Sequence, residues 1–216
     1  MTDNRAASSA ARGASHTGAA AQPRSPAVLW AESLQALANL VAHDFRNALN
    51  AVSVNLEVVR SRSARGAEAA AIAPFAATAA AHFETSAGAG EALVALVRAE
   101  PEPVDVAAVV MRLSRLIAVG GQSRLQVVDR SGGRARTGAP GDIVRVAVAR
   151  SVLGAVGAGE SVACEIAADD GIFLRVTGAT EVPPRPDSEV VTAAATYGIR
   201  IASRGQSIEL RFPEVD

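Results

Sequence analysis

The sequence predicts an α+β protein, a two-helix hairpin followed by a smaller α/β domain. Apolar residues recur at helical spacing over about residues 27–60, and an Ala-rich segment of similar character runs to about residue 99. Beyond residue 103 short alternating runs of strand type are mixed with shorter helical segments. The 216 residues are 49% hydrophobic but only 3% aromatic, so the cores must be built mainly from Ala, Val and Leu.

Residues 1–26 are predicted to form a disordered tail. They are rich in Ala, Ser, Gly and Thr, lack apolar periodicity and end with Pro23 and Pro26. His16 stands alone within this segment, so we expect it to be an inert tail residue.

The first helix carries an apolar stripe on one side and a polar ridge on the other. His43 points away from the stripe, and Asn47 and Asn50 follow it on the same ridge at i+4 and i+7. Asp44 lies nearer the apolar edge. The stripe consists of Trp30, Leu34, Leu37, Val41, Phe45, Ala48, Val52, Leu56 and Val59.

A polar break at Ser61 to Gly66 separates this helix from a return helix that ends near Ala99. Pro74 is expected near the start of the return helix or at a kink, and Gly88 and Gly90 weaken it by about 1 kcal/mol each. Two antiparallel helices of this length would leave a long apolar stripe unburied in a monomer. The hairpin, assigned to residues 27–100, is therefore predicted to form a homodimeric four-helix bundle.

The second domain, assigned to residues 104–216, follows a linker at 101–103. Asp169-Asp170-Gly171 is the predicted turn of its central hairpin. Its helices should cover one face of a sheet, as in a two-layer sandwich. The expected elements are a helix at 104–119, a strand at 125–129, a loop at 131–138, a helix at 141–156, strands at 161–167 and 172–177, a helix at 188–203 and a strand at 206–212.

Composition argues against several functional classes. A net charge of -1 offers no electrostatic attraction for nucleic acid. Cys164 is the single cysteine, which excludes an internal disulfide and a multi-cysteine metal site, and its alternating surroundings predict a buried strand thiol. No apolar run reaches the length of a membrane span, so we expect a cytoplasmic protein.

His43 is the strongest candidate for chemistry. A solvent-facing imidazole beside a carboxylate suits phosphoryl transfer, because one ring nitrogen can attack while the acid orients the other. The alternative is a surface histidine with no role. His82, on the return helix, lies closer to the apolar stripe and is not favoured as a phosphorylation site. The segment Ala-Gly-Ala-Gly-Glu at 87–91 lacks the Lys-Ser/Thr of a phosphate loop.

The segment His43-Asp44-Phe45-Arg46-Asn47-Ala48-Leu49-Asn50 resembles the H-box of bacterial two-component histidine kinases. The resemblance implies that His43 is the phospho-acceptor, that Asp44 acts as acid or base, and that Asn47 positions a water or the phosphoryl group. Arg46 and Asn50 are expected to contact a response-regulator receiver domain. The proline common in the family five residues after the histidine is absent, and Ala48 stands there.

The second domain resembles the ATP-binding domain of the same family at Glu102 to Val106, Gly141-Asp142 and Leu174 to Gly178. The stretch that matches the family's Mg²⁺-binding helix, 149–155, contains no Asn, and 176–180 lacks the adenine-reading Asp. The segment 181–186 is short and proline-rich. We therefore expect a degenerate histidine-kinase-type domain without ATP, Mg²⁺ or another metal, although Arg150 and Arg185 could hold an anion.

These observations predict a phosphorelay protein in two-component signalling. A phosphoryl group would move between His43 and receiver-domain aspartates without ATP binding, which makes the protein a histidine phosphotransferase. Three alternatives remain open: a divergent histidine kinase, a response-regulator phosphatase in which Asn47 and Asp44 position water, and a non-catalytic scaffold that binds receivers or kinases. The expected partners are a receiver domain and a second copy of the chain, with no nucleic acid and no membrane.

Overall fold

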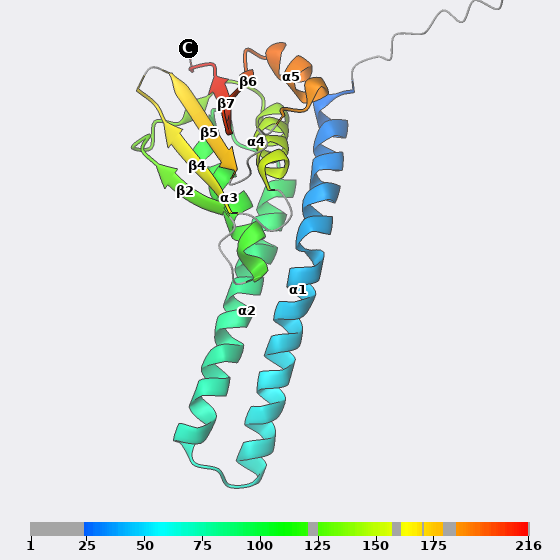
Figure 1. The fold of residues 1–216 in the computed structure, drawn as a ribbon, viewed down its shortest axis with the longest axis vertical. Helices are drawn as coiled ribbons and strands as arrows, with labels where there is room; N and C mark the ends of the chain where they lie inside the picture. Colours follow the sequence, from blue (N-terminus) through cyan, green and yellow to red (C-terminus); the bar gives the residue numbers. More distant parts are fainter. Residues whose placement is uncertain (1–23, 121–124, 157–160, 170, 179–184, 216) are drawn as a thin grey trace, which may run out of the picture.

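The computed structural model contains a long helical hairpin with an α/β unit at one end (Figure 1). It describes residues 24–120, 125–156, 161–169, 171–178 and 185–215. The predicted α+β class and the order of its two parts are confirmed. Most of the predicted disordered tail and most of the proline-rich segment at 181–186 lie outside the described residues.

The hairpin consists of α1, Pro26–Ala64, and α2, Ala69–Val97. The Ser25 hydroxyl caps α1 by accepting a hydrogen bond from Val28 N at 3.4 Å, and Pro26 occupies the first helical turn, where no amide donor is needed. The helix was predicted to end at residue 61, but α1 continues for about one more turn, to Ala64. The helix continues because its first strong breaker is Gly66, whose φ of 71° reverses the chain.

The α/β unit contains a five-stranded sheet in the order β2-β4-β5-β7-β6, with one parallel pair, β2 with β4. The predicted central hairpin is present, because β4 and β5 pair in antiparallel register. In chain order, the elements after the hairpin are β1 (Val104–Asp105), α3 (Val106–Ile117), the 3₁₀ turn η1 (Ala118–Gly120), β2 (Leu125–Asp129), β3 (Arg136–Thr137), α4 (Gly141–Ala155), β4 (Val162–Ala167), β5 (Ile172–Gly178), α5 (Ser188–Ala195), β6 (Arg200–Arg204) and β7 (Ser207–Phe212).

One face of this sheet is apolar and covered by helices, and the other is open and charged. On the open face, Arg175 lies between Glu165 and Glu209, with closest nitrogen-to-oxygen distances of 3.4 and 3.0 Å. Arg130 and Arg204 extend this row at its two ends, at 3.0 Å from Glu165 and 3.2 Å from Glu209. Charges of alternating sign therefore cross the sheet from one side to the other.

The predicted helix at 188–203 is wrong in its second half. Helix α5 ends at Ala195, and Gly198, with a φ of 77°, turns the chain while Ile199 N donates to Ala194 O at 3.1 Å. Residues 200–204 then form β6, which pairs with β7. Ala202 and Ser203 interrupt the alternation of apolar and polar residues that would indicate a strand in this segment. The pairing with β7 therefore decides its conformation.

A second difference is the two-residue ladder between β1 and β3. Val104 pairs with Thr137 and Asp105 with Arg136, where we had expected the start of a helix and a loop. Helix α3 therefore begins at Val106, with the Asp105 carboxylate accepting from Ala108 N at 3.0 Å.

A buried arginine joins the hairpin to the α/β unit. The side chain of Arg145, on α4, is 4% exposed and donates to the backbone carbonyls of Leu96 and Arg98 at 2.7 and 2.5 Å. It also pairs with Asp142, and its guanidinium carbon lies 5.0 Å from the centre of the Trp30 ring. These contacts connect α1, the carboxyl end of α2 and α4 through one cation.

Two further arginines hold the first turns of α1 against the α/β unit. Arg150, on α4, donates to Ser33 Oγ at 3.0 Å and to Glu32 Oε2 at 3.1 Å. Arg24 pairs with Glu32 and with Glu189 of α5, and its hydrogen bonds lower the pKa of the Glu189 carboxyl. Helix α4 consequently lies between the sheet and α1 (Figure 1).

We expect Arg145→Met to lower the free energy of unfolding by about 2–4 kcal/mol, because two buried carbonyl oxygens lose their donor. Urea unfolding followed by circular dichroism measures this change. Arg60→Met is the matched control, since Arg60 pairs with Glu57 on the solvent side of α1 and should matter little. Equal stability of the two variants would contradict a joining role for Arg145.

Candidate active site

The candidate site lies midway along α1, below the α/β unit. His43 is 76% exposed in its side chain and Asp44 only 17%, in agreement with their predicted positions relative to the apolar stripe. Asn47 and Asn50 are also exposed, so the polar ridge predicted from helical spacing exists in the fold.

The His43 ring contacts both polar neighbours predicted for it. Asn47 Nδ2 lies 3.0 Å from His43 Nδ1 and 3.4 Å from Nε2, so the amide sits beside the ring. Asp44 Oδ1 lies 3.5 Å from Nδ1. Nδ1 is thus the ring nitrogen that both neighbours contact, whereas Nε2 is approached by Asn47 alone among these two.

These two contacts favour opposite tautomers of His43. If Nδ1 carries the proton, it can donate to the Asp44 carboxylate, and Nε2 keeps the lone pair that a nucleophile needs. If Nδ1 accepts from the Asn47 amide, the proton resides on Nε2, which then cannot attack. Asp44 therefore promotes the reactive form, and Asn47 restrains it.

A pocket of about 270 Å³, named the polar pocket after its three polar side chains, opens between α1, α2 and η1. Its polar lining comes from Asp44 and Asn47 on α1 and from His82 on α2. Its apolar lining is Ala48, Ala51 and Val119. We had not favoured His82 because it lies closer to the apolar stripe. Its place beside Asp44 and Asn47 depends on how the two helices align, which the sequence alone does not show.

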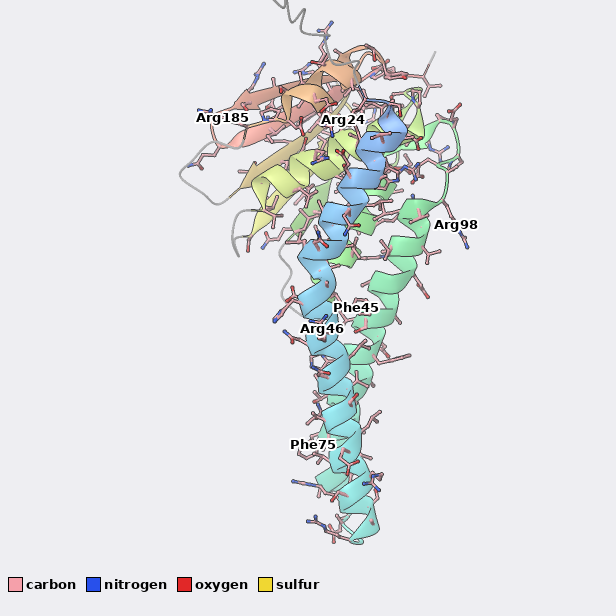
Figure 2. All side chains as sticks on the ribbon, turned by 90° about the vertical axis from the view of Figure 1, so that its right-hand side faces the viewer. Arg24, Phe45, Arg46, Phe75, Arg98 and Arg185 are labelled. Atoms are coloured by element: carbon pink, nitrogen blue, oxygen red, sulfur yellow. The ribbon has the colours of Figure 1, made fainter. Side chains whose placement is uncertain are left out.

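Arg46, three residues after His43 on α1, is exposed at the edge of the polar ridge. Together with Phe45 and Leu49 it lines an apolar groove of about 420 Å³ between the hairpin helices. Figure 2 labels Phe45 and Arg46 midway along α1. Of the two residues predicted to bind a receiver, Asn50 lies on the His43 ridge, and Arg46 lies between this ridge and the groove.

The predicted nucleotide-site helix is covered. Residues on all sides of α4 are buried, including Ile143, Val144, Arg145, Val146, Ala147, Val148 and Ala149. Arg150, which we considered as an anion ligand, is instead engaged with Glu32 and Ser33 of α1. The outer side of α4 thus faces protein.

Cys164 does not compete with His43 as a nucleophile. Burial raises the pKa of the Cys164 thiol to about 12, so this strand cysteine, buried as predicted, is protonated and unreactive at neutral pH. Within the described ranges, no three His, Cys, Asp or Glu side chains gather as a metal site would require. No helix in the described part of the chain combines the length and apolar character needed to span a membrane.

Comparison with solved structures finds a bacterial phosphotransferase, with a TM-score of 0.40 and 14% identity over 83% of this chain and 95% of that chain. The blue-light activated histidine kinase of Erythrobacter litoralis EL346 matches with a TM-score of 0.31 and 12% identity, over 82% of this chain and 59% of that chain. Its histidine kinase domain matches with a TM-score of 0.31 and 10% identity, over 75% and 94%. No family model and no curated protein matches the sequence.

We expect Asn47→Ala to shift His43 towards the tautomer protonated at Nδ1, because the competing amide donor is gone. Long-range ¹H–¹⁵N correlation spectra report the tautomer, and a His43→Gln spectrum assigns the signals. Asn50→Ala is the control, since Asn50 shares the ridge without contacting the ring within the described structure. Unchanged tautomer populations in Asn47→Ala would contradict this reading.

Proposed function

We propose that this chain is a phosphorelay protein of two-component signalling. His43 takes a phosphoryl group from the aspartyl phosphate of one receiver domain and passes it to the aspartate of another. The observation that carries this proposal is the 76% exposed imidazole of His43, whose Nδ1 is contacted by both Asp44 and Asn47.

The transfer step follows from these contacts. His43 Nε2 attacks the phosphorus, the bond from phosphorus to the acyl oxygen breaks, and the receiver carboxylate leaves as an anion. The phosphorylated ring carries a proton on Nδ1, and the Asp44 carboxylate stabilises the resulting positive charge. The second receiver reverses these steps, so no nucleotide is consumed.

The covered position of α4 supports a phosphoryl source other than ATP. The helix that resembles a nucleotide-site helix is fixed against α1 by Arg145 and Arg150. A divergent histidine kinase is the alternative, and it would require this helix to separate from α1. We further propose a cytoplasmic location, because receiver domains act there and the single thiol is reduced.

We propose that the protein works as a homodimer with a four-helix bundle. The hairpin carries an apolar face on which Leu49, Leu56 and Phe83 are 45%, 52% and 60% exposed. Two apolar grooves follow this face, one beside Phe45 and Leu49 and one, of about 260 Å³, beside Leu56 and Phe83. Such a face is more extensive than a monomer normally exposes, and a second hairpin would cover it.

The decisive experiment uses receiver domains from the same genome, each labelled with acetyl [³²P]phosphate. The wild-type chain should acquire acid-labile, alkali-stable label from at least one of them, and His43→Gln should acquire none because the nucleophile is lost. His16→Gln, a change of the same type in the N-terminal segment, is the control. Label retained by His43→Gln would refute the assignment, and label obtained from Mg²⁺ and [γ-³²P]ATP alone would identify a kinase instead.

Dimerisation is tested by placing charges on the apolar face. The double variant Leu56→Glu, Phe83→Glu should run as a monomer of 22.0 kDa in light-scattering chromatography, and the wild type at twice that mass, because buried carboxylates would oppose the bundle. Ser53→Glu, at an exposed position of α1 outside the two grooves, should leave the dimer intact. A monomeric wild type would contradict the proposal.

A further inference from the structure

The polar pocket contains an imidazole that phosphotransfer does not use. His82 is half-buried, and in the described part of the chain its ring nitrogens have no hydrogen-bond partner; its backbone carbonyl accepts from Ser86 Oγ at 2.8 Å. A half-buried histidine that faces a carboxylate and an amide, with both ring nitrogens available, is poised to exchange a proton.

The pocket is connected to the His43 ring through Asn47. The Asn47 side chain lines the pocket and also lies 3.0 Å from His43 Nδ1, so a group docked against His43 borders the pocket as well. A water molecule occupies about 30 Å³ in the liquid. The pocket volume of about 270 Å³ therefore accommodates a phosphoryl group together with water.

We infer that His82 is the general base for hydrolysis of a receiver's aspartyl phosphate in this pocket. The inference rests on the proposed docking of a receiver at the His43 ridge. A water oxygen attacks the phosphorus, the bond to the acyl oxygen breaks, and the receiver carboxylate leaves. The water proton goes to a His82 ring nitrogen, and inorganic phosphate departs. The chain then has two outputs, transfer through His43 and hydrolysis through His82.

His82 suits this role better than the other groups around the pocket. Asp44, from α1, is the only other titratable side chain among the described lining residues, and it already addresses His43 Nδ1. From η1 only Val119 faces the pocket, and α2 contributes His82 itself. Since a protonated imidazole cannot accept another proton, acid that protonates His82 should slow hydrolysis.

The test measures two products from the same labelled receivers, phosphate released and label on His43, between about pH 5 and pH 8. His82→Gln should lower phosphate release by roughly 10²–10⁴-fold and abolish its pH dependence, because the proton acceptor is lost. Label on His43 should be retained. Glu84→Gln, a conservative change on α2 outside the pocket lining, is the matched control and should leave both products unchanged.

His43→Gln separates this inference from the proposed function. The inference that His82 is the base is supported if phosphate release persists in His43→Gln and is lost in the double variant His43→Gln, His82→Gln. This holds even if the wild type acquires no label on His43. Three results overturn it: no acceleration of phosphate release by the wild type, unchanged release and pH profile in His82→Gln, or an equal fall of release and transfer, which indicates a structural role.

Discussion

The buried cation of Arg145 is the constraint on which the arrangement of the chain depends. A guanidinium removed from water needs compensation on several sides, and here the last carbonyls of α2, the Asp142 carboxylate and the Trp30 ring supply it. These partners come from the hairpin and from α4, so the guanidinium meets all of them only when the α/β unit sits at one position on the hairpin. That position brings η1, and with it Val119, over the polar pocket.

The same placement explains how the α/β unit can serve a site that we propose to work without ATP. Its role is to shape one wall of the pocket and to leave the ridge open. On that ridge, Asp44 and Asn47 act on one ring nitrogen in opposite directions. In the proposed transfer, a partner that draws the Asn47 amide away from Nδ1 would favour the tautomer that can attack.

Local patterns predicted those parts of the fold that depend on local spacing. Helical spacing placed His43 outward and Asp44 near the core, and alternation located β4 and β5. Long-range pairing decided the rest: β6 forms because β7 lies beside it, and Arg150 contacts α1 because α4 is held there. The position of His82 opposite Asp44 and Asn47 depends on how α2 aligns with α1, which no local pattern encodes.

The row of charges on the open face of the sheet has a consequence for how the strands find one another. A slip of one residue between β5 and β7 would turn Arg175 away from Glu209, and a slip of two would place the carboxylate opposite Phe173 or Thr177. Either error separates charges that are adjacent in the native pairing. Side chains of the open face thus add to the preference for a single strand alignment that the apolar face already favours.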